Sequence, residues 1–580
     1  MKKKNIYRKL IIPGCLTLLG GLSSCGDFLT LYPTNQVTDE QFWEDKKDLE
    51  SVLGAAYLNM AKNVVEPALV WGEIRSDNFA QKAENNNDIR DLMNANLLPT
   101  SGMFNWASFY TTINYANKVL EHGELIMARD PSFSLGNWQA VKAEAIAIRA
   151  LNYFYLVRAF RDVPYVSHSI DTDAEAVNNK PRREASQVVL TNILQDLESV
   201  KNDGMVEYGN SVFNKGRFSK RSIQALLADV YLWRASKNTS PDSVAKYPNM
   251  AAEDYAKCAE YSKWVIDDIK KEYENSYGPG NGNNSGSSAL EKKYPLIIME
   301  GLSSTTITDK AFNEIFGSGN SRESIFEIQF NGESVKNGAV TNYFKTKDTK
   351  NPLVGPSLLF QGLSAKPDDQ VKIYSITDLR QWENLFYEKS GQTEYHVYKY
   401  ASKSITTTDA EDVAKGVTYT SERYQNDANW IVYRLSDVML MRAEALVQLG
   451  GEANNAEAFE LVNAVFKRSN PKLKDENSLL FASYTTQKAL EELIMRERQR
   501  EFFAEGKRWF DLVRYAERKA STKPMLDILL KKYASNANAI KSKLGTMNSL
   551  YNPILKAEIK ANPNLVQNPV WEKDETITKN

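Results

Sequence analysis

Long segments with helical periodicity recur along the chain, and they limit the fold more than any other feature of the sequence. The clearest is 138–161, WQAVKAEAIAIRALNYFYLVRAFR, in which alanines alternate with large aromatic side chains until Pro164 follows. Small residues beside large ones allow neighbouring helices to approach and interlock. Comparable segments combine alanine with leucine, tyrosine or phenylalanine at 219–236, 432–449 and 496–515. The sequence therefore predicts a mostly α-helical protein.

Three of these segments are followed by a second helical candidate, which predicts that helices form pairs. The second members are 251–270, 454–468 and 508–519. Stacked helix pairs with small residues at their contacts are typical of tetratricopeptide-type scaffolds. Because the spacing is irregular, we expect degenerate tetratricopeptide-like pairs with long insertions rather than a regular array.

The middle of the chain lacks this periodicity. It begins with a run rich in glycine, asparagine and serine, and short extended runs follow at 324–330 and 394–400. This pattern predicts a loop-rich, irregular ligand-binding half on the helical scaffold, since loops held by a rigid scaffold often carry binding sites. The predicted parts are a leader at 1–24, a tether at 25–38, a helical part at 39–274, an irregular insertion at 275–428 and a second helical part at 429–580.

The first 25 residues have the pattern of a bacterial lipoprotein leader. An apolar run at 10–22, too short to span a bilayer, follows the basic residues Lys2, Lys3, Lys4, Arg8 and Lys9. The run ends in Leu-Ser-Ser-Cys25, which resembles a lipobox, where the cysteine thiol receives a diacylglyceryl group. Acyl chains on Cys25 would anchor the protein to a membrane. The alternative is ordinary secretion with an incidental cysteine.

The remaining composition argues against several classes of function. Five of the 72 lysines and arginines lie in the leader, which leaves 67 against 73 acidic residues and no basic surplus for nucleic acid. Apart from Cys15 and Cys25 only Cys258 remains, and the three histidines are scattered, so nothing favours a disulfide framework, a metal or a cofactor. The 10 tryptophans and 29 tyrosines favour binding over catalysis.

Several motifs, in order along the chain, resemble the SusD/RagB family of nutrient-binding outer-membrane lipoproteins. They are RAFRDVPY at 158–165, GRFS at 216–219 with the helix after it, YRLSDVMLMRAEA at 433–445, RERQREFFAEGKRWFDLVR at 496–514, YNPI at 551–554 and NPNLVQNP at 562–569. Departures from the family pattern are confined to the closing motifs, at Asn552, Leu555 and Val570.

The resemblance implies both a fold and a function. The fold would be four tetratricopeptide-like helix pairs with an irregular ligand-binding half. The protein would not be an enzyme. It would sit on the exterior of the outer membrane through its lipid, as a lid on a SusC-like TonB-dependent transporter, and would deliver a glycan or, in the RagB branch, a peptide. The alternative function is a lipid-anchored tetratricopeptide-type adaptor that binds a protein partner.

The most densely charged stretch, 496–515, raises the question of catalysis. Glu497, Glu501 and Glu505 lie at i, i+4 and i+8, so their carboxylates share a helix face, as a pair of glycosidase carboxyls could. An acid catalyst would need a raised pKa, whereas the neighbouring cations favour the ionised form. These cations are Arg498, Arg500 and Arg508. We therefore interpret the stretch as an ion network that locks the last helix pair to the rest, and we expect no catalytic residue.

Candidate ligand contacts are aromatic side chains near loops, with polar groups that could read sugar hydroxyls. One cluster, whose position is similar to that of glycan contacts in the resembled family, comprises Trp71, Arg75, Asp77 and Asn78. The next loop is flanked by Phe104 and Trp106, although Trp106 also fits the packing face of its helix. Later loops add Tyr294, Phe316, Tyr343 and Phe344.

Overall fold

The computed structural model describes the chain as two units, residues 1–44 and 45–580, and the account below concerns the second. The described residues are 42–277, 288–298, 307–308, 310–346, 349, 351–361, 372–375, 377–390, 392–402, 405–407, 417–419, 423, 426–471, 478–533 and 535–572. The leader, Cys25, the tether and most of the glycine-rich run at 278–287 lie outside them. Within these ranges, no helix combines the length and apolarity that a membrane span requires.

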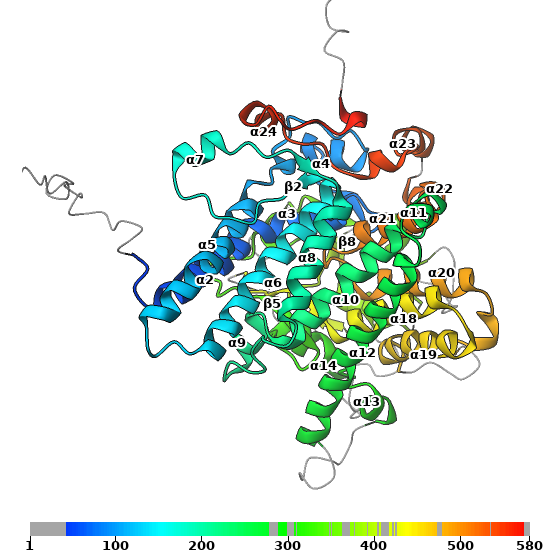
Figure 1. Cartoon of the computed structure of the whole chain (residues 1–580). Helices are drawn as coiled ribbons and strands as arrows, with labels where there is room; N and C mark the ends of the chain where they lie inside the picture. The colour runs from blue at the N-terminus through cyan, green and yellow to red at the C-terminus, as the bar shows by residue number, and fades with distance from the viewer. Residues whose placement is uncertain are drawn as a thin grey trace, which may run out of the picture. The chain divides into compact units, whose positions relative to one another are not determined.

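A series of packed helices forms one side of this unit (Figure 1). Along the series each helix packs against the next. The members are α2 (Lys46–Asn59), α5 (Ala107–Arg129), α6 (Leu135–Phe160), α8 (Ser186–Val200), α10 (Lys220–Lys237), α12 (Met250–Tyr277), α18 (Leu435–Leu449), α19 (Glu452–Ser469) and α20 (Gln487–Glu501). A further helix, α21 (Arg508–Lys519), packs on α10. The prediction of a mostly helical fold is confirmed, while its tetratricopeptide-like character stays a prediction.

Helix α6 shows how the alternation of small and large residues builds this scaffold. Every residue from 143 to 160 is buried, so neighbours cover the helix on all sides. Its aromatic rings interlock with adjacent helices, and Phe154 meets Trp233 of α10 edge to face with ring centroids 6.1 Å apart. The helix ends at Phe160, where Arg161 has a φ of +70°. This agrees with the helix predicted at 138–161.

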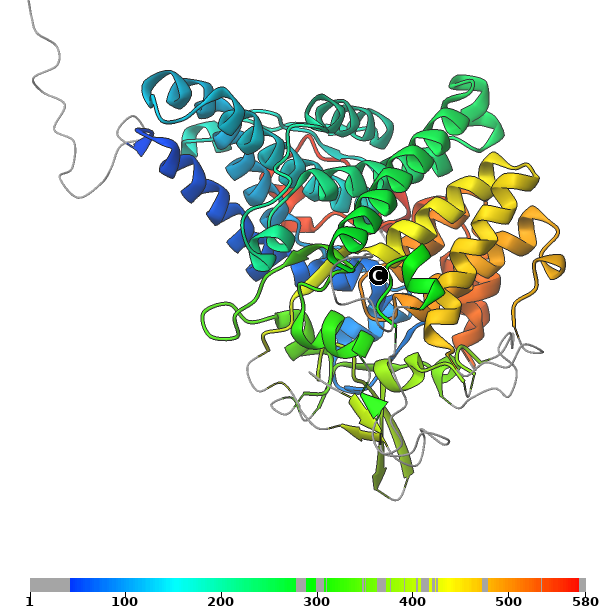
Figure 2. The same cartoon turned by 90° about the horizontal axis from the view of Figure 1, so that it is seen from below.

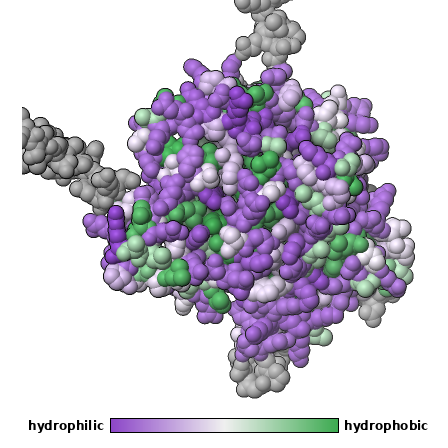
Figure 3. Space-filling model, viewed as in Figure 1, coloured by the Kyte–Doolittle hydropathy of each residue, from purple (hydrophilic) through white to green (hydrophobic). Residues whose placement is uncertain are grey.

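The outer surface of the series is mostly polar. On the face shown in Figure 3, hydrophilic side chains predominate and apolar ones lie in small, separate patches. Asp45 caps α2, because its side chain accepts a hydrogen bond from the backbone N–H of Lys47 and its own N–H donates to Asp48.

Short helices connect the longer ones. Before α5 these are η2 (Met60–Val64), α3 (Val65–Leu69), η3 (Val70–Ile74), α4 (Asn87–Met93) and η4 (Gly102–Phe104). The middle of the chain contains α7 (Asp173–Asn178), α9 (Ser211–Gly216), α11 (Pro241–Lys246), α13 (Ala289–Lys293), α14 (Lys310–Phe312), η5 (Asn313–Ser318), α15 (Gly338–Tyr343), η6 (Leu358–Phe360) and α16 (Arg380–Asn384). The last part contains η8 (Phe481–Ser483), α22 (Lys523–Leu529), η9 (Leu530–Lys532), α23 (Ala537–Lys543), η10 (Met547–Leu550), α24 (Lys556–Ala561) and η11 (Pro569–Trp571).

The strands are short, antiparallel and mostly gathered on one side of the helices (Figure 2). The pairs are β1 (Phe79–Gln81) with β6 (Val354–Pro356), β2 (Val163–Pro164) with β3 (Arg183–Glu184), β5 (Ser324–Ile328) with β11 (Trp430–Arg434), and β7 (Leu385–Ser390) with β8 (Gln392–Val397). A three-stranded sheet joins β4 (Ile307–Thr308), β9 (Ile405–Thr407) and β10 (Val417–Tyr419). The extended runs predicted at 324–330 and 394–400 overlap β5 and β8. The boundaries predicted for the parts of the chain stay predictions.

One predicted helix is too long at its start. Residues 432–434 were expected to be helical, but they complete β11, where Trp430 pairs with Ile328 and Tyr433 with Phe326. All residues of both strands are buried. Aromatic and β-branched side chains at Trp430, Val432 and Tyr433 suit such a strand better than a helix.

The turn between α20 and α21 is held by the N-terminal part of the chain. Helix α20 ends at Glu501, and Gly506 has a φ of +73°. A Cβ on Gly72 would lie 1.9 Å from the carbonyl oxygen of Gly506, so both positions require glycine. The buried carboxylate of Glu73 also accepts hydrogen bonds from three backbone N–H groups, those of Ala504, Lys507 and Arg508.

Candidate functional site

The three glutamates of the charged stretch belong to a buried ion cluster. Glu497, Glu501 and Glu505 are each at most 2% exposed. Arg380 lies 2.7 Å from Glu497 and 2.9 Å from Glu501, and Arg434 lies 2.8 Å from Glu505. Arg468 pairs with Glu501 as well, and Lys399 with Glu505. The cluster therefore ties α20 to α16, β11 and α19.

The charges in this cluster favour the ionised form of Glu501 and Glu505. Burial disfavours the charged form of Glu501, but the arginines around it outweigh burial and hold its pKa well below the ordinary value. The pKa of Glu505 is lowered for the same reason, against burial, by Arg434 and Lys399. A general acid needs a raised pKa. The lowered pKa values argue against a general-acid role for these two carboxylates, and the ion network predicted for this stretch is present.

The aromatic residues proposed as a sugar platform near the N-terminus lie in the core. Trp71 is 1% exposed, stacks on Phe109 with ring centroids 4.7 Å apart, and donates its indole N–H to the carbonyl of Met103. Phe104 and Trp106 are 2% and 3% exposed. Because these rings already pack against protein, almost none of their surface is accessible to a ligand.

The polar members of the same cluster also have protein partners. Arg75 donates to the carbonyl of Leu550 and to Asn552 Oδ1, so it fastens the closing segment of the chain. Asp77 accepts two hydrogen bonds from Arg508, at 2.8 and 3.0 Å. Burial would raise the pKa of Asp77, but Arg508 outweighs it and the pKa is lowered. Asn78, fully buried, donates to Glu73 at 2.6 Å. The structure brings these predicted residues together as a fold-stabilising cluster.

The later predicted residues differ in exposure. Phe316, Tyr343 and Phe344 are buried, and Phe344 stacks on Phe79 with ring centroids 6.0 Å apart. Tyr294 is half-buried. Its role in ligand binding stays a prediction.

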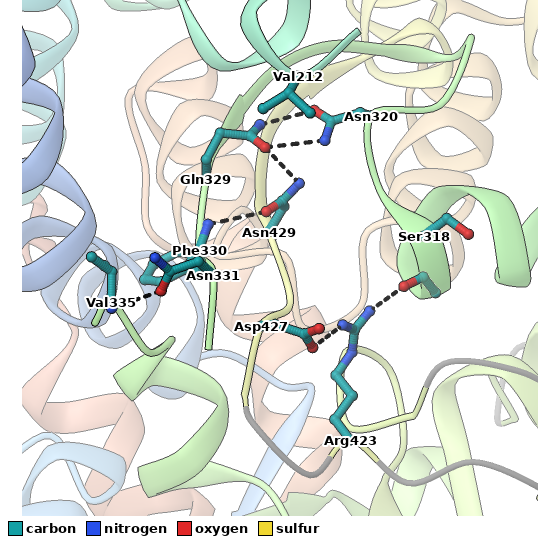
Figure 4. Close-up of a pocket in the computed structure, with 11 residues that line it drawn as sticks. Val212, Ser318, Asn320, Gln329, Phe330, Asn331, Val335, Arg423, Asp427 and Asn429 are labelled. Carbon is teal, nitrogen blue, oxygen red and sulfur yellow. Dashed lines mark hydrogen bonds and ion pairs between the residues drawn. The ribbon is translucent and has the colours of Figure 1, made fainter. Parts of the chain in front are cut away.

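A polar cavity, here called the amide pocket, lies at the edge of the irregular half (Figure 4). Its volume is about 560 Å³, within the roughly 300–1,000 Å³ that is typical of small-ligand sites. It opens beside the junction of β5 and β11, and it is lined by Val212, Gly317, Ser318, Asn320, Gln329, Phe330, Asn331, Val335, Arg423, Asp427 and Asn429. None of the residues predicted as ligand contacts lines it.

Three amide side chains form a connected network along one wall of the pocket. Asn320 and Gln329 exchange two hydrogen bonds, at 3.0 and 2.9 Å. Asn429 donates to Gln329 at 3.0 Å and to the buried carboxylate of Glu327 at 2.8 Å. Glu327 also accepts from the backbone N–H of Asn320. A buried carboxylate thus fixes the orientation of half-buried amides that face the cavity.

The opposite wall carries a fixed cation. Arg423 pairs with Asp427 at 2.5 Å and donates to the carbonyls of Phe316 and Gly317. Its Nε is buried and has no hydrogen-bond partner among the residues that the structure describes. Burial lowers the pKa of Arg423, although Asp427 opposes that change. Figure 4 shows the guanidinium between Asp427 and the chain beside Ser318, across the pocket from the amides.

This arrangement suits recognition of the hydroxyl groups of a ligand. Amides offer donors and acceptors without net charge, and pre-oriented groups lose little conformational entropy when a ligand binds. Phe330, at 8% exposed, supplies a small apolar surface beside them. Among the described residues, no group of three histidine, cysteine, aspartate or glutamate side chains is placed to hold a metal.

Sequence reasoning missed the amide pocket for a specific reason. Its wall joins Asn320 and Gln329 to Asn429, about a hundred residues later, through the pairing of β5 with β11. The available signal was the concentration of asparagine and glutamine at the ends of the predicted strand 324–330. That signal does not show which distant segment completes the wall.

Two further cavities are lined by described residues. The Tyr110 cleft, of about 470 Å³, has Trp106, Tyr110, Pro164 and Leu565 in its wall. The cationic groove, of about 540 Å³, lies beside α20 and has Asp77 at its base. Two of the predicted residues, Trp106 and Asp77, therefore border cavities even though their side chains are almost fully buried.

Comparison with known proteins identifies the family. A family model described as "SusD family" matches residues 231–571, and one described as "Starch-binding associating with outer membrane" matches residues 27–232. Curated relatives include SusD-like protein P38 of Formosa agariphila, 29% identical over 528 residues that cover 89% of this chain and 92% of the relative. SusD-like protein P2 of the same organism is 24% identical and covers 89% and 91%.

Solved structures agree on the fold. NanU of Bacteroides fragilis has a TM-score of 0.63 at 17% identity, covering 94% of this chain and 100% of its own. A SusD homolog from Bacteroides thetaiotaomicron has a TM-score of 0.61 at 22% identity, covering 92% and 100%. Since the first family model covers more than half of the 580 residues, the chain belongs to the SusD family.

Proposed function

We propose that the protein is a lipid-anchored nutrient-binding protein of the outer membrane that captures an oligosaccharide and passes it to a SusC-like TonB-dependent transporter. The observation that carries this proposal is the match of the chain to the SusD family model, with a second model that is described as starch-binding and outer-membrane-associated. The leader pattern that ends at Cys25 supports anchoring through lipid. The exterior location is what the resemblance to the SusD/RagB family implies.

The amide pocket is the site that we propose for the sugar. Its amides can read hydroxyl groups, and Arg423 can donate to a ring or glycosidic oxygen. A sugar would thereby replace the water that hydrates these groups in the free protein. The ligand would be bound and released without chemical change.

Calorimetry on the leader-free protein tests the proposal. Wild type is titrated with a panel of oligosaccharides and short peptides. We expect the Gln329→Ala variant to bind the preferred sugar about tenfold more weakly, because Asn320 and Asn429 lose their shared partner. The matched control is Asn178→Ala, which removes an exposed amide on α7. Circular dichroism confirms that both variants are folded at the titration temperature.

The panel also separates the alternatives. Binding of peptides alone would indicate a RagB-like peptide-binding protein. No binding to any small ligand, together with a retained protein partner, would indicate a tetratricopeptide-type adaptor and would contradict the proposal.

Anchoring and transport need separate experiments. A Cys25→Ala variant should not incorporate labelled palmitate and should leave the membrane fraction. A tagged protein should co-purify with a TonB-dependent barrel from detergent-solubilised outer membranes. Absence of such a barrel at stoichiometric amounts would contradict the transporter part of the proposal.

A further inference from the structure

The cationic groove differs from the amide pocket in both position and charge. It lies between α20, the α21–α22 segment and the residues around Lys372. Its volume is about 540 Å³, large enough for part of an oligosaccharide chain. Helix α21 packs against both α20 and α22, so two walls of the groove are fixed to one another (Figure 1).

Cations outnumber anions along the groove. Six basic side chains line it above the base, namely Lys372, Lys488, Arg496, Lys519, Lys523 and Lys531. The acidic residues on the same walls are Glu492 and Asp527, and Glu491 lies beneath Lys519. The chain as a whole has 72 basic and 73 acidic residues, so this surplus is local. A concave surface with one sign of charge concentrates ligands of the opposite sign.

The ion pairs in the groove are weak enough to exchange for a ligand. Lys488 lies 3.8 Å from Glu492, with 79% of the lysine side chain exposed. Lys523 lies 3.0 Å from Asp527, with 78% of the lysine side chain exposed. Pairs this exposed contribute little to stability. Lys531 is exposed and has no ion-pair partner in the part of the chain that the structure describes.

The base of the groove adds no negative charge. At the base Asp77 is neutralised by Arg508 through two hydrogen bonds, and Gln499 donates to Asp77 as well. Apolar side chains, among them Met495 and Ile528, also line the groove. The Tyr515 hydroxyl lines the groove and has no hydrogen-bond partner among the described residues.

We propose that the cationic groove binds an oligosaccharide that carries sulfate or carboxylate groups. The apolar side chains accommodate the C–H face of a sugar ring, Tyr515 reads a hydroxyl, and the surrounding lysines pair with the anionic substituents. The inference rests on the proposed function and makes it more specific, because it names the charge of the sugar. An acidic peptide could pair with the same lysines. We favour the anionic sugar because the proposed function of the protein is to capture glycans.

A charge-reversal experiment tests the groove. The leader-free protein is titrated with sulfated galactan oligosaccharides, oligogalacturonate, uncharged amylose oligosaccharides and polyglutamate. The groove variant combines Lys488→Glu, Lys523→Glu and Lys531→Glu. The control variant changes three exposed lysines outside the groove by the same total charge, namely Lys62→Glu, Lys246→Glu and Lys560→Glu.

We expect wild type and the control variant to bind one of the two anionic sugars, and the groove variant to bind it at least about tenfold more weakly. Added salt should weaken wild-type binding, since exposed charges are screened. The sulfated and uronate probes distinguish the two sources of negative charge. A single Lys531→Ala variant, which keeps the neighbouring ion pairs, should weaken the same binding by a smaller factor.

Several results would overturn the inference. One is equal loss of affinity in the groove and control variants, which would indicate a general charge effect. Another is tight binding of polyglutamate without binding of either anionic sugar. Binding of the uncharged sugar alone would overturn the inference and leave the proposed function intact, whereas binding of none of the sugars would contradict both.

Discussion

Helix α20 carries charged residues on two faces, and the two faces have opposite environments. On one face Glu497 and Glu501 are at most 2% exposed and are surrounded by arginines. On the other face Lys488 and Glu492 have 79% and 51% of their side chains exposed and line the cationic groove. The residue types are nearly the same, so burial decides their roles.

This difference in exposure indicates which charges stabilise the fold and which are accessible to a ligand. Removing one member of a buried ion pair leaves its partner without compensation, at a cost of about 3–5 kcal/mol. An exposed pair contributes roughly 0–1 kcal/mol because water and salt screen it. The buried cluster should therefore respond to mutation through stability, and the groove through binding.

The largest loss of stability should follow from replacing Arg434, which lies in the buried cluster. It lies 2.8 Å from Glu505, pairs with Glu501 and is 1% exposed. We expect Arg434→Ala to lower the free energy of unfolding by about 3–5 kcal/mol, because two buried carboxylates lose a partner. Urea unfolding followed by circular dichroism measures this change.

The matched control for Arg434→Ala is Arg182→Ala, which removes an exposed arginine. The control should change the free energy of unfolding by less than about 0.5 kcal/mol. If both variants lost the same stability, burial would not distinguish the two kinds of charge.

A smaller loss of stability is expected when Arg500, which borders the same cluster, is replaced. Its Nε donates to the carbonyl of Ile373 at 2.8 Å, and it lies 3.4 Å from Glu497. Arg500→Ala should lower the free energy of unfolding by roughly 2–3 kcal/mol, since a charge-assisted hydrogen bond and an ion pair are lost. Sugar affinity, measured by calorimetry on the folded variant, should stay unchanged. Unchanged melting with lost affinity would instead place Arg500 in a binding site.

Acidification should lower the stability of the fold through the buried carboxylate of Asp437. Burial would raise the pKa of Asp437, but Lys507 and Arg498 outweigh it and lower the pKa to about 2. A carboxyl with a lowered folded-state pKa contributes stability above its ordinary pKa, which is lost as the pH falls toward the folded value. From about pH 4 to pH 2, Asp437 alone should account for a loss of about 2 kcal/mol.

Urea unfolding at several pH values checks this expectation. The free energy of unfolding of Asp437→Asn should fall less steeply over the same pH interval than that of wild type. The difference should equal the contribution of the one carboxyl that the variant lacks. The control Asp173→Asn alters an exposed carboxyl on α7 and should follow the wild-type slope. Identical slopes for all three proteins would show that Asp437 does not take part.

The sequence predicted the helical scaffold well because local pattern determines it. The helices predicted at 138–161 and 219–236 correspond to α6 and α10 within a few residues. Their alternation of small and large side chains is visible over a single segment, and Ser219 supplies the N-cap of α10. The predicted ion network at 496–515 was also correct, since dense opposite charges beside large aromatics require burial with partners.

The binding residues were harder to predict because exposure depends on distant contacts. Trp71 and Asp77 have the residue types of a sugar site, but Phe109 covers the first and Arg508, 431 positions away, neutralises the second. The wall of the amide pocket likewise needs Asn429 beside Gln329. No pattern in a single segment indicates which of these polar groups remains accessible.

The smallest effect on stability, and the sharpest test of the comparison, is expected on the exposed face of α20. Lys488 forms only a 3.8 Å pair with Glu492, and 79% of its side chain is exposed. Lys488→Ala should change the free energy of unfolding by less than about 0.5 kcal/mol, since solvent already screens this pair. The same variant should weaken binding of an anionic sugar measurably, because the lysine lines the groove. A stability loss comparable to that of Arg434→Ala would contradict the distinction between buried charges that stabilise the fold and exposed charges that bind a ligand. An exposed charge would then stabilise the fold as strongly as a buried one.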